Sequence, residues 1–352
     1  MQSPSFRKRT TRFAAAVGST VGSTLATALA TTLTTALGIT LLALPAAQAQ
    51  TRAWPERPVK VIVPAPPGSA PDAMVRLLGA KLAEVWGQPV TIENVVGASG
   101  NIGTDRAAKA PADGYTLLYN TIGPIAVNGT LFAGKLPYDA VKDLAPISLV
   151  VKVPNILTVH PGLPYRNVRD LIAAAKKDPG KIRYATAGPG TTQHLSGELL
   201  NTLVGIQTIG IPYKSSAQMT IDAIGGQFEL MFHNAPVVLP HIKAGSLRAL
   251  AITSAKRSAS LPEVPTMVEA GVNGFEVTAW FGFMAPTGTP AAVIQKVSAD
   301  VARLVATPDI QARMATDASE PVGGTPDDYA TFIKAEIIKW AAVVKQANMK
   351  PE

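Results

Sequence analysis

Residues 59–63 begin with alternating apolar and polar positions and end in a continuous apolar run. This pattern predicts a strand that enters the protein core. A Pro/Gly run follows, and Pro71 then opens a segment with apolar residues at helical spacing, since proline is tolerated in a first helical turn. Apolar strands are predicted again at residues 90–92 and 115–119, and a glycine loop at residues 97–103 opens another helix between them. This order predicts a mostly parallel sheet covered by helices.

The same succession of strands and helices returns after residue 150. Strands are predicted at residues 155–159, 181–185, 228–232, 247–252 and 280–284. Helices are predicted at residues 168–176, after a second glycine loop at residues 188–192, and around residues 293–304. The tetrapeptide Thr325-Pro326-Asp327-Asp328 has the form of a helix-start cap, so the last helix is expected to begin there.

The composition agrees with this pattern and excludes several classes of protein. The 352 residues suit two lobes, and 47% hydrophobic with 16% charged residues argues against disorder or a coiled coil. The net charge is +8, but four of the basic residues precede position 50. The remaining Lys and Arg residues form no cluster with interleaved aromatics, so no nucleic acid partner is expected. There is no cysteine, which excludes thiolate catalysis, disulfides and cysteine-ligated zinc.

Residues 1–49 have the features of a signal peptide. A basic start at residues 7–12 precedes a long Ala/Thr/Leu stretch, Pro45 ends the apolar part, and Ala47-Gln48-Ala49 offers a small-x-small cleavage pattern. The strongly apolar part is far shorter than the roughly 20 residues that a membrane span needs, which argues against a permanent anchor. We therefore expect cleavage near Ala49/Gln50 and a periplasmic mature protein.

Two loops that join a strand to a helix, at residues 64–72 and 186–194, are the strongest candidates for a binding site. A helix N-terminus has unpaired backbone N–H groups and partial positive charge, so it can bind an anion without Lys or Arg. Glycines in both loops allow the backbone to approach a ligand closely, and hydroxyls add further donors. Either loop alone is better explained as an ordinary capped turn, but their matching places in two α/β halves favour a cleft site.

The sequence contains no complete motif for phosphate binding, a nucleophilic serine or a metal. Gly188-Pro189-Gly190 lacks the third glycine of a dinucleotide loop, and the loop at Gly97 lacks the Gly-Lys-Ser/Thr ending of a phosphate-binding loop. No G-x-S-x-G element is present. His194 and Glu198 could form half a metal site, but a third ligand is not evident. We therefore expect no metal and no cofactor, while the partners of a Ser/His/Asp hydrolase cannot be placed from sequence.

An ordered set of short motifs resembles one known family. The motifs are Val61-Ile62-Val63-Pro64 with Pro67-Gly68 and Asp72, the glycine loop at residues 97–103, Asp113-Gly114-Tyr115-Thr116-Leu117, Gly188-x-Gly190 with His194-Leu195 and Gly197-Glu198, Pro212-Tyr213-Lys214, Gly225-Gly226-Gln227, Pro262-x-Val264-Pro265-Thr266 with Glu269-Ala270-Gly271, and Trp280 with Ala285-Pro286-x-Gly288-Thr289-Pro290. Each motif is weak, but the set covers nearly the whole mature chain in order and at family spacing. The sequence is therefore similar to the Bug family, the extracytoplasmic receptors of tripartite tricarboxylate transporters.

The resemblance implies an α/β, type II periplasmic-binding-protein fold, with two lobes of mostly parallel sheets flanked by helices and a hinge of crossover strands. One lobe would comprise residues 50–152 and 275–352, and the other residues 153–274, with crossovers near residues 150–155 and 272–280. The resemblance also implies a monomeric, non-enzymatic receptor. It would carry a small mono- or dicarboxylate, aromatic acids included, to integral-membrane permease subunits. The alternatives are an orphan sensor for a signalling partner and a periplasmic hydrolase or isomerase.

The two loops and the resemblance together give a set of expected ligand-binding residues. These are Ala65, Gly68, Ser69, Asp72, Thr121, Thr186, Ala187, Gly190, Thr191, His194 and His233. The hydroxyls of Thr186 and Thr191 are expected to hold the carboxylate, because a buried anion needs donors. Asp72 is expected to act through the shape of its loop, because it would repel a ligand of like charge.

Four of these positions, namely Ala65, Ser69, Thr186 and His233, depart from the usual family pattern, and Ala65 and His233 bear on the choice of ligand. Family members usually have an aromatic residue where Ala65 stands, which implies a roomier pocket here. The family position after the Met-Phe pair is commonly acidic and is His233 in this chain. A histidine at a strand end can donate a hydrogen bond or, when protonated, add positive charge. We therefore expect an anionic or aromatic acid rather than an amino acid, with binding that tightens from about pH 8 toward 6, and with a capping or core histidine as the alternative.

Overall fold

Three parallel strands form the centre of the first half of the chain, where β1 pairs with β2 on one side and with β3 on the other. The elements of this half are β1 (Val59–Val63), α2 (Ala70–Trp86), β2 (Val90–Asn94), η1 (Ala98–Gly100), α3 (Asn101–Ala108), β3 (Thr116–Asn120), η2 (Gly123–Val127) and α4 (Asn128–Leu131). The computed structural model describes residues 54–351, so the predicted signal peptide and its cleavage site lie outside the described residues.

The second half repeats this arrangement, with β5 between β6 and β7 and all three strands parallel. Its elements are α5 (Val168–Lys177), β5 (Arg183–Thr186), α6 (Thr192–Val204), β6 (Ile209–Pro212), α7 (Ser216–Ile224), β7 (Leu230–Asn234), α8 (Ala235–Lys243) and β8 (Arg248–Ile252). The repeated strand–helix order predicted from the hydrophobic pattern is therefore present in both halves.

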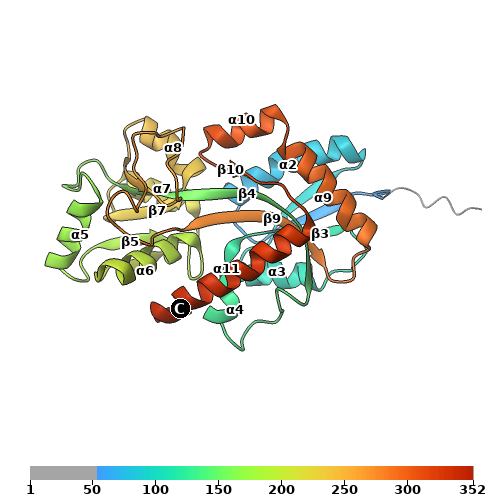
Figure 1. Cartoon of the computed structure of the whole chain (residues 1–352), viewed down its shortest axis with the longest axis horizontal. Coiled ribbons are helices and arrows are strands. Elements are labelled where there is room, and N and C mark those ends of the chain that lie inside the picture. Colours follow the sequence, from blue (N-terminus) through green and yellow to red (C-terminus); the bar gives the residue numbers. More distant parts are fainter. Residues whose placement is uncertain (1–53, 352) are drawn as a thin grey trace, which may run out of the picture. The chain divides into compact units, whose positions relative to one another are not determined.

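Two long strands join the parallel sets. β4 (Leu144–Val159) pairs antiparallel with β9 (Thr278–Pro286), which also pairs with β3, while β4 continues to β7 and β8. Figure 1 shows β4 and β9 running side by side between the two sets. Every antiparallel pair in residues 54–351 involves one of these two strands. The predicted fold class, two α/β lobes joined by crossover strands, is confirmed, while the lobe boundaries stay a prediction.

The strand predicted at residues 155–159 is the last third of a much longer one. β4 begins at Leu144 and includes Pro146 and Pro154. Proline lowers the expectation of a strand because it cannot donate to a ladder. The register of β4 against β9 shifts directly after Pro146, and this irregularity in the ladder accommodates the proline ring.

The C-terminal helices cover the sheet and close the core. They are α9 (Ala291–Val305), α10 (Pro308–Thr316) and α11 (Pro326–Gln346), with the short strand β10 (Glu320–Pro321) before α11. The helix start predicted at Thr325 is confirmed, because Thr325 and Asp328 form a reciprocal capping box. Inside the core, the indole nitrogens of Trp280 and Trp340 both donate to Glu336 Oε2, each at 2.8 Å. The Trp280 bond ties α11 to β9, while the Trp340 bond lies within α11 and fixes the Glu336 carboxylate.

We predict that Glu336→Leu lowers the free energy of unfolding by about 2–4 kcal/mol, because it leaves two buried indole N–H groups without an acceptor. Glu336→Gln keeps one oxygen and should lose less. The measurement is urea denaturation, with Lys334→Ala as the exposed control on the same helix. Equal unfolding midpoints for Glu336→Leu and Lys334→Ala would contradict this role for Glu336.

Candidate functional site

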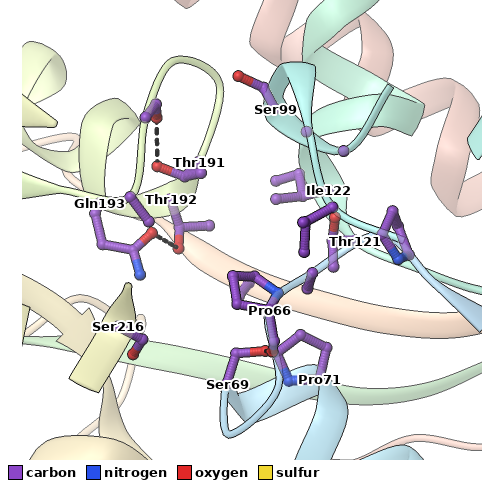
Figure 2. Close-up of a pocket in the computed structure, with 18 of the residues that line it drawn as sticks. Pro66, Ser69, Pro71, Ser99, Thr121, Ile122, Thr191, Thr192, Gln193 and Ser216 are labelled. Atoms are coloured by element: carbon purple, nitrogen blue, oxygen red, sulfur yellow. Dashed lines mark hydrogen bonds between the residues drawn. The ribbon is translucent and has the colours of Figure 1, made fainter. Parts of the chain in front are cut away.

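A cavity of about 560 Å³ lies at the carboxyl ends of the parallel strands of both lobes. Residues at or just beyond the ends of β1, β2, β3, β5, β6 and β7 contribute to its wall, and β9 supplies Ala279 and Phe281. Figure 2 shows the side chains of the two lobes facing each other across this space. Because open α/β sheets bind ligands beyond the carboxyl ends of their strands, this cavity is the candidate site.

In the described part of the chain, five α-helices begin at the cavity wall. The wall residues at these helix starts are Ser69 of α2, Gly100 of α3, Thr191 of α6, Ser216 of α7 and Asn234 of α8. A helix start presents unpaired N–H groups and partial positive charge. Of the described residues that form the wall, Lys214 adds a positive charge and none is Asp or Glu. The wall is therefore suited to an anion.

Asp72 shapes the β1–α2 loop from behind the cavity wall, where it is 4% exposed. Its Oδ2 accepts from the Gly68 N–H, and its Oδ1 accepts from Arg76 Nε and Asn94 Nδ2, each at 2.9 Å. Asn94 also donates to the carbonyl of Ala65 at 3.0 Å. Burial raises the pKa of Asp72, but hydrogen bonds from Arg76, Gly68 and Asn94 outweigh it, so the pKa lies below its ordinary value. Asp72 therefore stays charged and supports the loop.

The two threonines expected to hold a carboxylate have their hydroxyls engaged within the β5–α6 loop. Thr191 Oγ1 donates to the Gly188 carbonyl at 2.7 Å and accepts from the His194 N–H at 3.5 Å as the N-cap of α6. Thr186 is 1% exposed and lies behind the wall, where it accepts from the Gly188 N–H at 3.2 Å. This loop therefore offers a ligand the main-chain N–H groups of the first turn of α6 more directly than its hydroxyls.

Gly190 and His194 also lie behind the wall, at a contact between the two lobes. Gly190 has a φ of +74°, and a Cβ there would overlap Asn128 Oδ1 of the first lobe. The Gly190 N–H donates to His194 Nδ1 at 3.4 Å. Burial lowers the pKa of His194 to about 4, so this ring is neutral and fixes the loop as an acceptor.

The turn before α3 carries backbone strain at the cavity wall. Gly97, Ala98, Ser99 and Gly100 have consecutive φ values of 124°, 45°, 56° and 87°. Positive φ is unfavourable for Ala98 and Ser99, and such strain is concentrated at binding and catalytic sites. Asn128 holds the turn by donating to the Ser99 carbonyl at 3.3 Å. The glycine loop is visible in the sequence, but it matches neither a phosphate-binding motif nor a nucleophile motif, and Ser99 was therefore left out of the expected site.

His233 lies within β7, where it pairs with Ile156, and is 2% exposed. Its Nδ1 accepts from the Asn234 N–H at 2.8 Å, and its Nε2 lies 2.9 Å from Ser216 Oγ. Burial lowers the pKa of His233 to about 4. The expected tightening of acid binding between pH 8 and 6 therefore does not follow, because the ring is already neutral throughout that range.

The structure brings six of the eleven expected residues to the cavity wall, namely Ala65, Ser69, Thr121, Ala187, Thr191 and His233. The other five lie behind it, namely Gly68, Asp72, Thr186, Gly190 and His194. Those five shape the two loops through the bonds described above.

Sequence reasoning missed Ser216 and Lys214 at the wall because it missed helix α7. A signal was present, since Ser215 and Gln218 have the Ser-x-x-Gln spacing of a helix start. In the structure the Gln218 N–H donates to Ser215 Oγ at 3.3 Å, which confirms that cap.

Residues 54–351 contain neither a metal-binding cluster of side chains nor a helix that could span a membrane. No set of three His, Cys, Asp or Glu side chains in this range is placed to hold a metal ion. No helix of the same range is both long enough and apolar enough to cross a membrane.

The two lobes, the crossover strands and the cavity between helix starts define a class: solute-binding receptors of the type II periplasmic-binding-protein fold. Residues 74–349 match the profile of the tripartite tricarboxylate transporter family receptor. The chain belongs to this family, which confirms the resemblance seen in the sequence motifs.

Individual relatives are similar over most of their length. The chain is 40% identical to protein BugT of Bordetella pertussis over 306 residues, which are 87% of this chain and 94% of that protein. Rpa4515 of R. palustris, solved with adipate, has a TM-score of 0.81 at 38% identity, covering 85% of this chain and 100% of that one. MatC from Rhodopseudomonas palustris with bound malate has a TM-score of 0.77 at 31% identity, covering 83% and 100%.

We predict that His233 makes stability depend on pH between about 6.5 and about 4. The unfolded chain binds the proton near pH 6.5 and the folded chain only near 4, so stability falls as the pH falls through this window. The loss is on the order of 3 kcal/mol. Denaturant unfolding of wild type and His233→Gln measures it, and the two curves should diverge only below about pH 6.5. Parallel curves down to pH 4 would refute it.

Proposed function

We propose that this chain is a receptor that binds a small carboxylate in the cavity between its lobes and delivers it to a tripartite-type membrane permease. The observation that carries the proposal is the wall itself, at which five α-helices of the described chain begin. Lys214 adds the wall's positive charge, and no Asp or Glu contributes to it within the described residues. Converging helix starts favour a negative ligand without a cluster of cationic side chains.

The apolar part of the wall supports a ligand with a hydrocarbon segment. Pro66, Pro71, Ile122 and Phe281 line the cavity between its polar groups. Figure 2 shows Ser99 beside Ile122 on one side of the cavity and Ser216 beside Gln193 on the other. Relatives of similar fold were solved with adipate and with malate, which are both dicarboxylates. We infer that the ligand is a linear acid of about this size, because the cavity volume lies within the usual range for small-molecule sites.

The cavity contains a Ser–His pair that resembles part of a hydrolase site, but its geometry supports binding and not catalysis. A general base must have a ring nitrogen free to take the serine proton. His233 Nδ1 already accepts from the main chain, so the ring proton is on Nε2, the nitrogen that faces Ser216. His233 therefore cannot deprotonate Ser216 in this state, which favours the receptor over the hydrolase or isomerase alternative.

The cellular context of the proposal rests on the signal peptide and the family. We propose that residues 1–49 direct export, that cleavage occurs near Ala49/Gln50, and that the monomeric mature protein acts in the periplasm. Its partners would be the small acid and the integral-membrane permease subunits.

The function is tested by native mass spectrometry of the protein purified from the periplasm without refolding, followed by calorimetric titration. We expect a co-purified small acid, and binding of adipate or malate without turnover. Release of a chemically altered product, or a failure of every linear acid of four to eight carbons to bind, would overturn the proposal.

We predict that the two lobes, residues 50–152 with 275–352 and residues 153–274, close on the ligand by bending near residues 150–155 and 272–280. Hinge closure around a ligand brings the lobes together. Small-angle scattering should therefore give a smaller radius of gyration at saturating adipate or malate, and an unchanged radius would speak against closure.

We predict that the geometry of the β5–α6 loop contributes more to the free energy of acid binding than the positive charge of Lys214 at the cavity wall. Thr191→Val removes the donor to Gly188 and the cap of α6, and should weaken acid binding by about 1–3 kcal/mol. Thr191→Ser keeps the hydroxyl and should bind nearly as wild type. Lys214 is exposed, so Lys214→Gln should cost less than about 1 kcal/mol and the cost should shrink with salt. If Lys214→Gln abolished binding while Thr191→Val bound normally, this mechanism would be wrong.

A further inference from the structure

The hydrogen bonds around His233 settle which ring nitrogen carries the proton. The Asn234 N–H donates to Nδ1 at 2.8 Å, so Nδ1 supplies a lone pair and has no proton. The ring is 2% exposed, and burial keeps it neutral. The single ring proton is therefore on Nε2, which donates to Ser216 Oγ at 2.9 Å.

This tautomer in turn sets the direction of the Ser216 hydroxyl. One lone pair of Oγ accepts from His233, so the hydroxyl proton points away from the ring. Within residues 54–351, no further hydrogen bond of Ser216 Oγ is formed, and the residue lines the cavity. The Ser216 proton is consequently a donor without a protein acceptor, and a donor left unpaired on ligand binding costs free energy.

The surroundings of Ser216 carry positive potential. Ser216 is the first residue of α7, and Asn234, which lies beside His233, is the N-cap of α8. Lys214 lies two residues before Ser216 on the same wall. An ammonium group here would meet helix starts and a lysine, and it would leave the hydroxyl proton unpaired.

We infer that Ser216 is a specificity-determining residue and that His233 holds its hydroxyl as a hydrogen-bond donor. Ser216 then selects ligands whose second polar group is an acceptor oxygen and rejects ligands that carry an amine at that position. This inference rests on the proposed function, in which a first carboxylate is already held in the cavity. Ser216 touches the ligand, and His233 acts through it as a positioning residue.

Three six-carbon probes of matched length test the inference in calorimetric titrations: adipate, 6-aminohexanoate and hexanoate. If adipate does not fit the cavity, the same series is made at the chain length of the linear dicarboxylate that binds best. Wild type should bind adipate at least tenfold more tightly than 6-aminohexanoate. Ser216→Ala should weaken adipate binding about 10- to 100-fold and change hexanoate binding less than about threefold.

The role of His233 is tested by two variants and one spectrum. His233→Gln can still donate to Ser216 and should keep the preference for adipate, whereas His233→Leu frees the hydroxyl and should reduce the preference about tenfold. Nitrogen NMR of the wild type should show the ring proton on Nε2. This spectrum does not depend on whether a variant folds, and thermal melts identify any variant that does not.

The outcomes separate this inference from the proposed function. A proton on Nδ1, unchanged adipate binding in Ser216→Ala, or an equal loss for hexanoate overturns the role of Ser216 while the receptor function stands. Equal preference for adipate in His233→Leu and wild type overturns the positioning role. Failure of all acids to bind the wild type overturns the proposed function, and the inference falls with it.

Discussion

The antiparallel pairing of β4 with β9 is the constraint on which the rest of the structure depends. β4 pairs with β9, β7 and β8, so one strand contributes to the hydrogen-bond ladders of both lobes. This shared strand positions two sets of parallel strands so that their carboxyl ends face one cavity over Ala279 and Phe281. Helix starts that would otherwise be separate, solvent-facing turns then act on the same small volume, and their partial charges add.

Donors from the main chain suit a receptor that must exist both empty and loaded. A buried Lys or Arg would need a partner in the empty state, because an unpaired buried charge is strongly destabilising. N–H groups at helix starts can bind water when the ligand is absent and exchange it when the ligand arrives. Lys214 avoids the same difficulty because it is exposed. The charged side chain that supports the β1–α2 loop, Asp72, is paired with Arg76 and lies behind the cavity wall.

Those parts of the site that rest on local signals could be predicted from the sequence. The positions of Gly and Pro residues located the β1–α2 and β5–α6 loops. The first loop brings the predicted residue Ser69 to the cavity wall, and the second brings Thr191. Thr186 shows the limit of such signals. It ends β5 opposite Pro212, and which way its side chain faces depends on the pairing of β5 with β6 and β7, not on nearby sequence. Ser216 was missed for a different reason, because α7 has only nine residues and its helix-start spacing, Ser215 with Gln218, was overlooked.

His233 shows most clearly how main-chain geometry decides chemistry that residue type leaves open. A histidine at a site predicts a pH switch, and a serine 2.9 Å away suggests a catalytic pair. Both roles require a ring nitrogen with a free lone pair. One N–H group, that of Asn234, occupies the lone pair of Nδ1 and leaves the proton on the nitrogen that faces Ser216. Because the ring is also buried and neutral, it can neither take a proton from Ser216 nor add charge near pH 7, and the role left to it is that of a donor to the Ser216 hydroxyl.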